Sequence, residues 1–277
     1  MGVSKLKIRL ISALIGAIFV LGMIFSKPTV FHIGVAVACF IVLHELQATF
    51  KQGKKWQLVV LQYAFAVALL LVPFIHSGIR QELTVFLLTA YLMLLLICSV
   101  IWHESVKFAD ALVSFFAVIY GVIFPLYLTY IRSMEWGVAL VFLPFLGAWM
   151  PDTFAYFIGC RFGKHKLIPG VSPNKTIEGA AGAVFGSIVT FTLYGFILTY
   201  GFHLQVCYPA LIGLSLLCSI VAQFGDLTAS VIKREYNMKD FGNLIPGHGG
   251  ILDRVDSLLF IAPVVYYFLM IFEVVCK

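Results

Sequence analysis

Residues 83–102 read LTVFLLTAYLMLLLICSVIW, a run that contains no charged side chain. A helix of about 20 apolar residues is long enough to cross the hydrocarbon core of a bilayer. The whole chain is similarly apolar, since 61% of its 277 residues are hydrophobic and 12% are charged. A soluble domain is typically about 25% charged. The sequence therefore predicts an integral membrane protein.

Similar apolar runs lie on both sides of this one. They predict an all-α, polytopic bundle of about nine transmembrane helices. The first run follows Lys5, Lys7 and Arg9 and precedes another span directly, which favours an uncleaved anchor over a signal peptide. The predicted spans are residues 10–25, 30–48, 56–75, 83–102, 111–131, 136–158, 177–200, 209–232 and 257–275.

Basic residues are distributed unevenly between the connecting segments. The net charge is +6, and an inside N-terminus places all of the 19 Lys and Arg residues on the cytosolic side except Lys27, Arg80, Arg132 and Lys277. Cytoplasmic loops of membrane proteins carry such an excess. We therefore expect a cytosolic N-terminus and an outside C-terminus. We expect no nucleic-acid partner.

The two parts of the chain differ in polar content. We expect residues 1–135 to form a transmembrane scaffold and residues 136–277 a catalytic transmembrane region of the same membrane domain. His44-Glu45 and His103-Glu104 fall at inner ends of predicted spans. Interfacial anchoring is the simpler interpretation of these pairs, and metal binding is the alternative. The numerous glycines are interpreted as packing residues, because small residues let membrane helices approach closely.

Carboxylates interrupt the later spans. Asp226 precedes Lys233 by seven residues and Asp152 precedes Arg161 by nine, so each lies ~10–14 Å below a cytosolic loop at ~1.5 Å per helical residue. Asp253 and Asp256 come near the start of the ninth predicted span. Four carboxylates from three helices are therefore expected near one level. Ionisable residues at membrane depth are candidates for function.

The chemistry of these residue types points to a metal–phosphate site. Oxygen ligands suit Mg²⁺, which commonly takes one or two carboxylates together with substrate phosphates. Glycines in the loop Pro246–Gly250 would let backbone N–H groups approach a phosphate. Simpler alternatives are a polar contact for Asp152, an ordinary turn for the loop, and topogenic charges for the basic residues. The candidate anion contacts are Lys233, Arg234, Lys239, His248 and Arg254.

The polar segments resemble a known family, the phosphatidate cytidylyltransferases or CDP-diacylglycerol synthases. The resemblance is strongest over residues 230–256, where the sequence reads Ser230-Val-Ile-Lys233-Arg234, then Lys239-Asp240, then Pro246-Gly-His248-Gly-Gly-Ile-Leu-Asp253-Arg254-Val-Asp256. The segments around Asp152, 172–179 and 225–227 are also similar. The specific match covers about residues 149–260. It departs from the family pattern at Asn174, Ile177 and Ala229.

The resemblance implies transfer of the cytidylyl group from CTP to phosphatidate, giving CDP-diacylglycerol and pyrophosphate at the cytoplasmic membrane. It also implies Mg²⁺ dependence, a second cation that can be K⁺, and a homodimer in the lipid bilayer. The metal positions would be Asp226 and Asp253, to which geometry adds Asp256 and, as a further candidate, Asp152. The expected catalytic residues are Asp226, Lys233, Arg234, Lys239, Asp253 and Arg254. The expected substrate-binding residues are Ser172, Asn174, Lys175, Thr176, Glu178, Ser230, His248, Gly249 and Gly250.

Two other functions would also use intramembrane carboxylates. An ion-coupled transporter would keep them near the bilayer midplane at broken helices, whereas here they lie toward a basic cytosolic loop. A CTP-dependent polyprenol or phytol kinase would use similar groups to transfer phosphate alone. The sequence contains no Asp-Gly…Ala-Arg…Gly…Asp…Asp run of the kind found in CDP-alcohol phosphotransferases.

Overall fold

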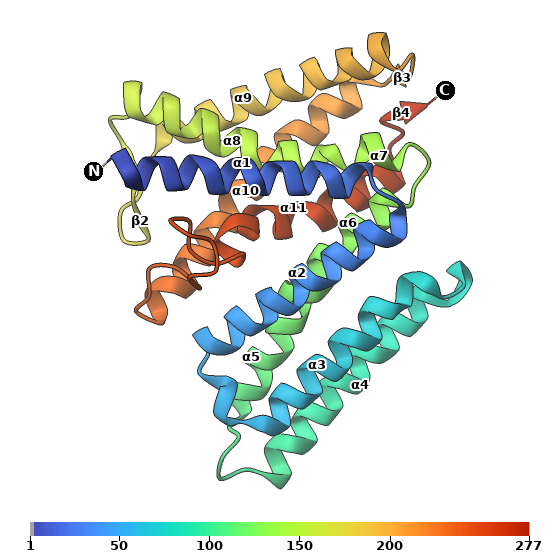
Figure 1. The fold of residues 1–277 in the computed structure, drawn as a ribbon, viewed down its shortest axis with the longest axis vertical. Coiled ribbons are helices and arrows are strands. Elements are labelled where there is room, and N and C mark those ends of the chain that lie inside the picture. The colour runs from blue at the N-terminus through green and yellow to red at the C-terminus, as the bar shows by residue number, and fades with distance from the viewer. Residues whose placement is uncertain (1–2, 277) are drawn as a thin grey trace. The chain divides into compact units, whose positions relative to one another are not determined.

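The computed structural model describes residues 3–276, and the side chains of residues 11–275. It is helical almost throughout (Figure 1). A π-helical turn, η4 (Ile119–Ile123), joins α5 (Phe108–Val118) to α6 (Phe124–Arg132). A second one, η5 (Ile197–Gly201), extends α9 (Ile177–Phe196). Short 3-10 turns are η1 (Gln52–Lys54), η2 (Val72–Phe74) and η3 (Ser77–Ile79). The α-helices are α1 (Val3–Phe25), α2 (Pro28–Thr49), α3 (Trp56–Leu71), α4 (Arg80–Ile101), α5 (Phe108–Val118), α6 (Phe124–Arg132), α7 (Gly137–Leu140), α8 (Phe142–Phe162), α9 (Ile177–Phe196), α10 (Tyr208–Glu235) and α11 (Leu252–Ile271).

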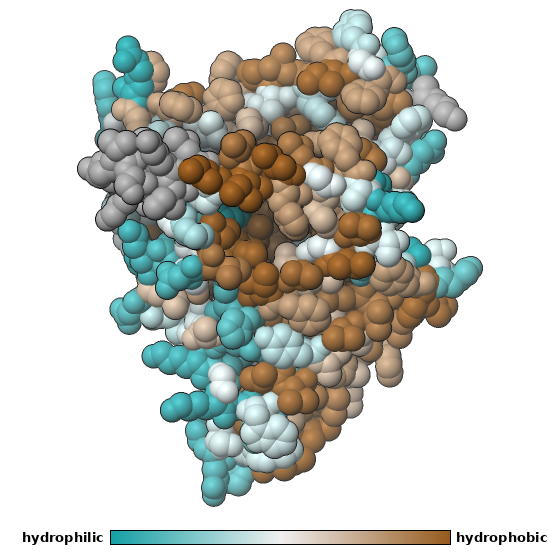
Figure 2. Space-filling view, viewed as in Figure 1, coloured by the Kyte–Doolittle hydropathy of each residue, from teal (hydrophilic) through white to brown (hydrophobic). Residues whose placement is uncertain are grey.

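Eight of the described helical segments are long and apolar enough to cross a membrane. They coincide with the last eight predicted spans to within a few residues at most ends, and residues 11–25 form a shorter apolar helix. Large apolar side chains remain exposed on them, including Val100 at 74% and Ile271 at 73%. Figure 2 shows such residues over much of the visible face. The prediction of an all-α, polytopic membrane protein is confirmed.

Short strands are the exception to the all-α prediction. β1 (Lys166–Ile168) and β2 (Ser172–Thr176) form an antiparallel hairpin between α8 and α9, with Lys166 opposite Thr176. β3 (Gln205–Val206) pairs with β4 (Val275–Cys276). These strands are too short to show an alternating pattern in the sequence. The first hairpin nevertheless shapes the polar segment before α9.

The chain forms two compact units. The first contains the described part of Met1–Tyr130 together with Asp240–Leu252, and the second contains Ile131–Lys239 and the described part of Asp253–Lys277. In the first unit, α3 packs against α4 and α5, and α2 packs against η4. A buried polar network crosses this packing: the Gln62 amide nitrogen donates to Gln52 Oε1 at 2.8 Å and to Ser114 Oγ at 2.7 Å.

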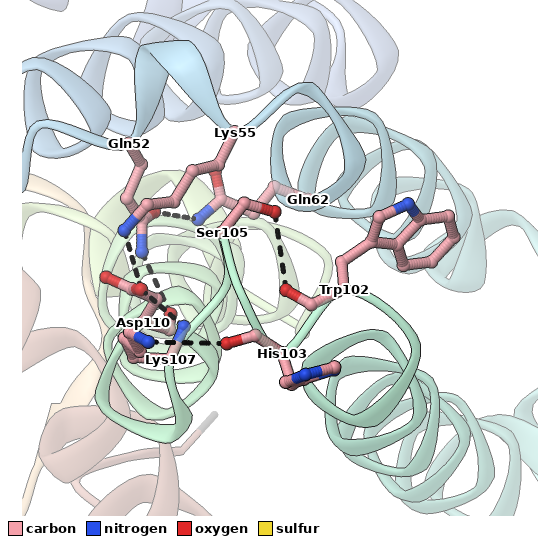
Figure 3. Close-up of polar contacts among 8 residues, drawn as sticks. All are labelled: Gln52, Lys55, Gln62, Trp102, His103, Ser105, Lys107 and Asp110. Atoms are coloured by element: carbon pink, nitrogen blue, oxygen red, sulfur yellow. Dashed lines mark hydrogen bonds and ion pairs between the residues drawn. The ribbon is translucent and has the colours of Figure 1, made fainter.

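The network continues to the start of α5 (Figure 3). The Gln52 amide nitrogen donates to the Asp110 carbonyl oxygen at 2.9 Å, and Lys55 Nζ lies 2.6 Å from Asp110 Oδ2. Asp110 also accepts the backbone N–H of Lys107 at 2.8 Å. His103 lies in the exposed turn after α4, where its carbonyl oxygen accepts a hydrogen bond from Lys107 Nζ at 3.4 Å and its imidazole ring points away from these contacts in Figure 3. The second His-Glu pair is therefore a surface feature, as the anchoring interpretation expects.

In the second unit, α8 packs along α9, and α10 packs on both. Glycines permit these approaches. A Cβ at Gly182 would lie 2.7 Å from Ile158 Cβ, and one at Gly225 would lie 3.0 Å from Ser257 Cα. The expectation that glycines serve helix packing is confirmed at both positions. Gly225 directly precedes Asp226, so the close approach of α10 to α11 occurs beside a candidate site residue.

Candidate functional site

Two acid–lysine pairs form the centre of the candidate site, which lies in the second unit. The Lys175 ammonium group on β2 forms an ion pair with Asp226 on α10. Lys233 Nζ, at the end of α10, lies 2.8 Å from Asp253 Oδ1 on α11. The side chain of Asp253 is 1% exposed and that of Lys233 is 14% exposed. A buried carboxylate is stable only when such a charge or hydrogen bond compensates it.

Two further carboxylates lie near the first pair. Asp152 on α8 and Asp256 on α11 both interact repulsively with Asp226, and Asp152 also interacts with Asp256. Asp152 is attracted in turn to Lys175 and Arg254. Asp256 Oδ1 accepts the Ser257 backbone N–H at 2.7 Å. Asp152, Asp226 and Asp256, from three helices, therefore lie within range of one another's charge.

A pocket of about 530 Å³ opens beside these residues. Pockets of roughly 300–1,000 Å³ are typical of small-molecule sites. Of the predicted site residues, it is lined by Asp152, Asn174, Lys175, Thr176 and Asp226. A cationic side chain, carboxylates and an amide therefore converge on one cavity from α8, β2 and α10.

Sequence reasoning missed several lining residues. Gln223, one turn before Asp226 on α10, reaches the pocket, as does Lys166 on β1. Ala155, Tyr156 and Gly159 follow Asp152 at helical spacing on α8. That spacing was a usable signal, because residues three, four and seven positions apart share one helix face. Gly159, Gly163 and Gly179 line the pocket, so these glycines contribute to the site as well as to packing.

The hairpin places Lys175 through contacts at the start of α9. The Thr176 hydroxyl accepts the Gly179 N–H at 3.1 Å and caps this helix. Glu178 accepts the backbone N–H groups of Lys164 and His165 at 3.1 and 3.2 Å, and its Oε1 lies 2.7 Å from His165 Nδ1. In this structure Glu178 therefore holds the segment that leads into β1. Its predicted role in substrate binding stays a prediction.

Other predicted residues lie outside this pocket lining. Ser172 is on β2 and half-buried, and Ser230 is half-buried on α10. Arg234 is exposed in the last turn of α10, and Lys239 is exposed in the connection that follows. Their roles as substrate contacts stay predictions.

The predicted glycine loop belongs to the first unit. Gly247 and Gly249 adopt positive φ angles of 77° and 85°, a conformation that favours glycine. His248 Nδ1 lies 2.8 Å from Ser12 Oγ. Gly250 faces the Glu45 carboxylate. The expected phosphate contacts of His248, Gly249 and Gly250 stay predictions, while Gly250 has a separate steric reason to be glycine.

The carboxylates of the site are the type of ligand that a hard cation prefers. Among the described side chains, no group of three or more His, Cys, Asp or Glu residues is spaced to hold a metal ion by itself. Mg²⁺ usually needs only one or two carboxylates, with water and phosphate oxygens completing its shell. Asp226 and Asp253 each face an ammonium group, and Asp152 and Asp256 add unfavourable negative charge. Lys175 and Lys233 therefore offset part of the negative charge of these carboxylates.

The chain is similar to known proteins of one family. Residues 7–272 match the model of the cytidylyltransferase family. The phosphatidate cytidylyltransferase of Bacillus subtilis is 32% identical over 278 aligned positions, which cover 97% of this chain and 99% of that protein. The phosphatidate cytidylyltransferase of Staphylococcus aureus is 32% identical over 258 positions, and that of Staphylococcus saprophyticus is 31% identical, each covering 93% of this chain and 96% of the relative. The chain therefore belongs to the cytidylyltransferase family.

Proposed function

We propose that this protein is a phosphatidate cytidylyltransferase: it transfers the cytidylyl group of CTP to phosphatidate and releases pyrophosphate. The observation that carries the proposal is the match to relatives of that name over nearly their whole length. The pocket supports it, because Lys175, Asp226 and Asp152 converge there within a membrane fold. A substrate anchored in the bilayer by its acyl chains requires a site that a membrane protein can present.

The reaction is an in-line displacement at phosphorus. A phosphate oxygen of phosphatidate attacks the α-phosphorus of CTP, a new P–O bond forms, and the bond to the departing pyrophosphate breaks. The nucleophile is already anionic at neutral pH, so no strong general base is needed. The main barrier is the approach of two anions. Lys175 and Lys166 line the pocket and can bind phosphate oxygens, which orients the reactants and lowers their repulsion.

The acidic residues hold the cations in this proposal. Asp226 and Asp253 would bind Mg²⁺ and a second cation that can be K⁺, with Asp256 and Asp152 as additional oxygen donors. Bound Mg²⁺ would supply charge neutralisation for the attacking and leaving phosphate oxygens. Lys175 and Lys233 then have a second function, since they neutralise Asp226 and Asp253 whenever a cation is absent.

Differently labelled CTP tests the proposed reaction. Purified protein is incubated with phosphatidate, Mg²⁺ and CTP labelled either in the cytosine ring or in the γ-phosphate. Cytidylyl transfer puts only the ring label into the lipid and the γ-label into pyrophosphate. A lipid kinase would put the γ-label into a lipid acceptor, here a polyprenol or phytol supplied in a parallel reaction. Absence of both lipid labels, with ion flux into vesicles, would instead support a transporter.

Replacing Lys239 by alanine should mainly weaken CTP binding. Lys239 is exposed, and a solvent-accessible phosphate contact contributes about equally to the ground state and the transition state. Loss of such uniform binding raises KM with a smaller change in kcat. CTP titrations of the purified variant measure both constants. A large fall in kcat at unchanged KM would contradict this role.

The proposal also assigns an orientation, in which the protein lies in the cytoplasmic membrane with its active site on the cytosolic side. A reporter fused after Lys277 should score as external, and one inserted between Lys233 and Pro246 should score as cytosolic, because basic residues concentrate in the segments assigned to the cytosol. Paired fusions with a reporter active outside and one active inside measure both positions. If both ends of the chain lie on the same side of the membrane, a count of nine spans is excluded.

We further propose that the protein is a homodimer. The mass of the detergent-solubilised protein would establish this.

A further inference from the structure

Glu45 is a buried carboxylate on α2, in the part of the chain expected to be scaffold. It is 5% exposed, so its interpretation as an interfacial anchor is wrong. Its Oε1 accepts the backbone N–H of Ile251 at 2.9 Å, and its Oε2 accepts that of Leu252 at 2.8 Å. These partners lie 206 and 207 residues further along the chain. One side chain therefore holds two consecutive backbone amides of a distant segment.

Two glycines make room for this carboxylate. A Cβ at Gly250 would lie 2.5 Å from Glu45 Oε1 and 2.7 Å from Oε2, and one at Gly242 would lie 2.8 Å from Oε1. Contacts under 3.0 Å are essentially never made by a real Cβ atom. Residues 240–252 thus approach Glu45 at two points where only glycine fits without movement. The same segment donates both hydrogen bonds, so it encloses the carboxylate.

The bonded amides lie at the N-terminus of α11. The first N–H groups of a helix have no partner within the helix, and a negative charge near them is favourable. Leu252 is the first residue of α11, and its N–H is satisfied by Glu45. The next residue is Asp253, whose side chain pairs with Lys233. Because Asp253 directly follows Leu252, fixing the Leu252 amide restricts the position of the Asp253 backbone and therefore of its carboxylate.

We infer that Glu45 is a positioning residue for Asp253: its carboxylate fixes the start of α11 and so orients the candidate metal-binding aspartate. This role rests on the proposed function, in which Asp253 takes part in cytidylyl transfer.

Glu45→Gln tests this role with little change in size. The amide keeps one acceptor oxygen but turns an N–H₂ group toward one of the two backbone N–H groups. We expect faster hydrogen exchange in peptides covering residues 249–256, measured without CTP or phosphatidate. We also expect kcat to fall by about 10- to 100-fold, since a misplacement of about 1 Å can cost on the order of 100-fold. The KM for CTP should change much less.

Glu104→Gln is the matched control, because Glu104 also follows a histidine at the inner end of a span but is exposed. It should leave exchange, kcat and thermal stability unchanged. Glu45→Gln protein with normal exchange at 249–256 and normal kcat would overturn the inference. If wild-type protein transfers no cytidylyl group while exchange still depends on Glu45, the proposed function fails and the contact stands. If wild-type protein transfers the cytidylyl group but Glu45→Gln protein shows normal exchange at 249–256, the proposed function stands and the role of Glu45 fails.

Gly250→Ala provides a second test that does not remove the carboxylate. The added Cβ should displace Glu45 and increase exchange at 249–256, with a fall in kcat. In the Glu45→Ala background, the same substitution should have little additional effect on either measurement, because the clashing atoms are gone. An equal additional loss of kcat in both backgrounds would show that Gly250 acts independently of Glu45 and would overturn this part of the inference.

Discussion

Asp226→Asn and Asp253→Asn are each expected to lower the turnover number by about two orders of magnitude or more. Asparagine keeps the size and polarity of aspartate but removes the charge that holds a cation. Changing a partner of a metal ligand already costs roughly 10- to 100-fold, so loss of the ligand itself should cost at least as much. The measurement is transfer of ring-labelled CTP to phosphatidate by purified variants, with Mg²⁺ titrated for each.

Both variants should still insert and fold. Removal of a negative charge at Asp226 relieves its repulsion with Asp152 and Asp256. In the Asp253→Asn variant, the amide oxygen of the new side chain can still accept a hydrogen bond from Lys233. Glu235→Gln at the exposed end of α10 is the control for charge removal alone and should keep full activity. Asp253→Asn protein with near-normal transfer at ordinary Mg²⁺ concentration would remove this residue from the metal assignment.

Lys175→Met is expected to lower kcat/KM by about 10- to 100-fold. Lys175 lines the pocket and pairs with Asp226, so the substitution removes a cation from phosphate and leaves Asp226 without this ammonium partner. Hydrogen bonds to charged groups contribute about 1.5–3 kcal/mol, and each 1.4 kcal/mol is about tenfold. Initial rates over a range of CTP and phosphatidate concentrations measure the effect.

Lys164→Met is the matched control for Lys175. Lys164 precedes the same hairpin, is exposed, and does not line the pocket. It carries the same charge, so a general effect of positive charge on lipid binding would appear in both variants. Equal losses for Lys164→Met and Lys175→Met would mean that the pocket position of Lys175 is unimportant. Raised Mg²⁺ should not restore Lys175→Met, because the missing group is a phosphate contact.

The helices and the polar positions within them could be predicted from the sequence because both depend on local patterns. The bilayer requires about 20 consecutive apolar residues, so runs such as residues 83–102 mark a span whatever packs beside it. The depth of Asp152 and Asp226 follows from counting residues to the next basic loop. In the second unit these two carboxylates lie within range of each other's charge.

Contacts between distant segments could not be predicted in this way. The spacing around Lys175 does not reveal that the β1–β2 hairpin pairs it with Asp226, because the hairpin is too short for a pattern. Gly250 was predicted to let backbone N–H groups approach a phosphate, whereas in the structure its missing Cβ makes room for the Glu45 carboxylate. A side chain on one helix cannot signal which backbone amide of another segment it will meet.

The sequence by itself determined that this is a polytopic helical membrane protein, and it predicted carboxylates near one level of its later spans. It did so because hydrophobic length and helical rise are properties of a single segment. Only the tertiary structure decided which charges pair, which glycines face a side chain, and that Glu45 holds the start of α11. These depend on how helices remote in sequence pack, since the energy of a buried charge is set by the atoms that surround it.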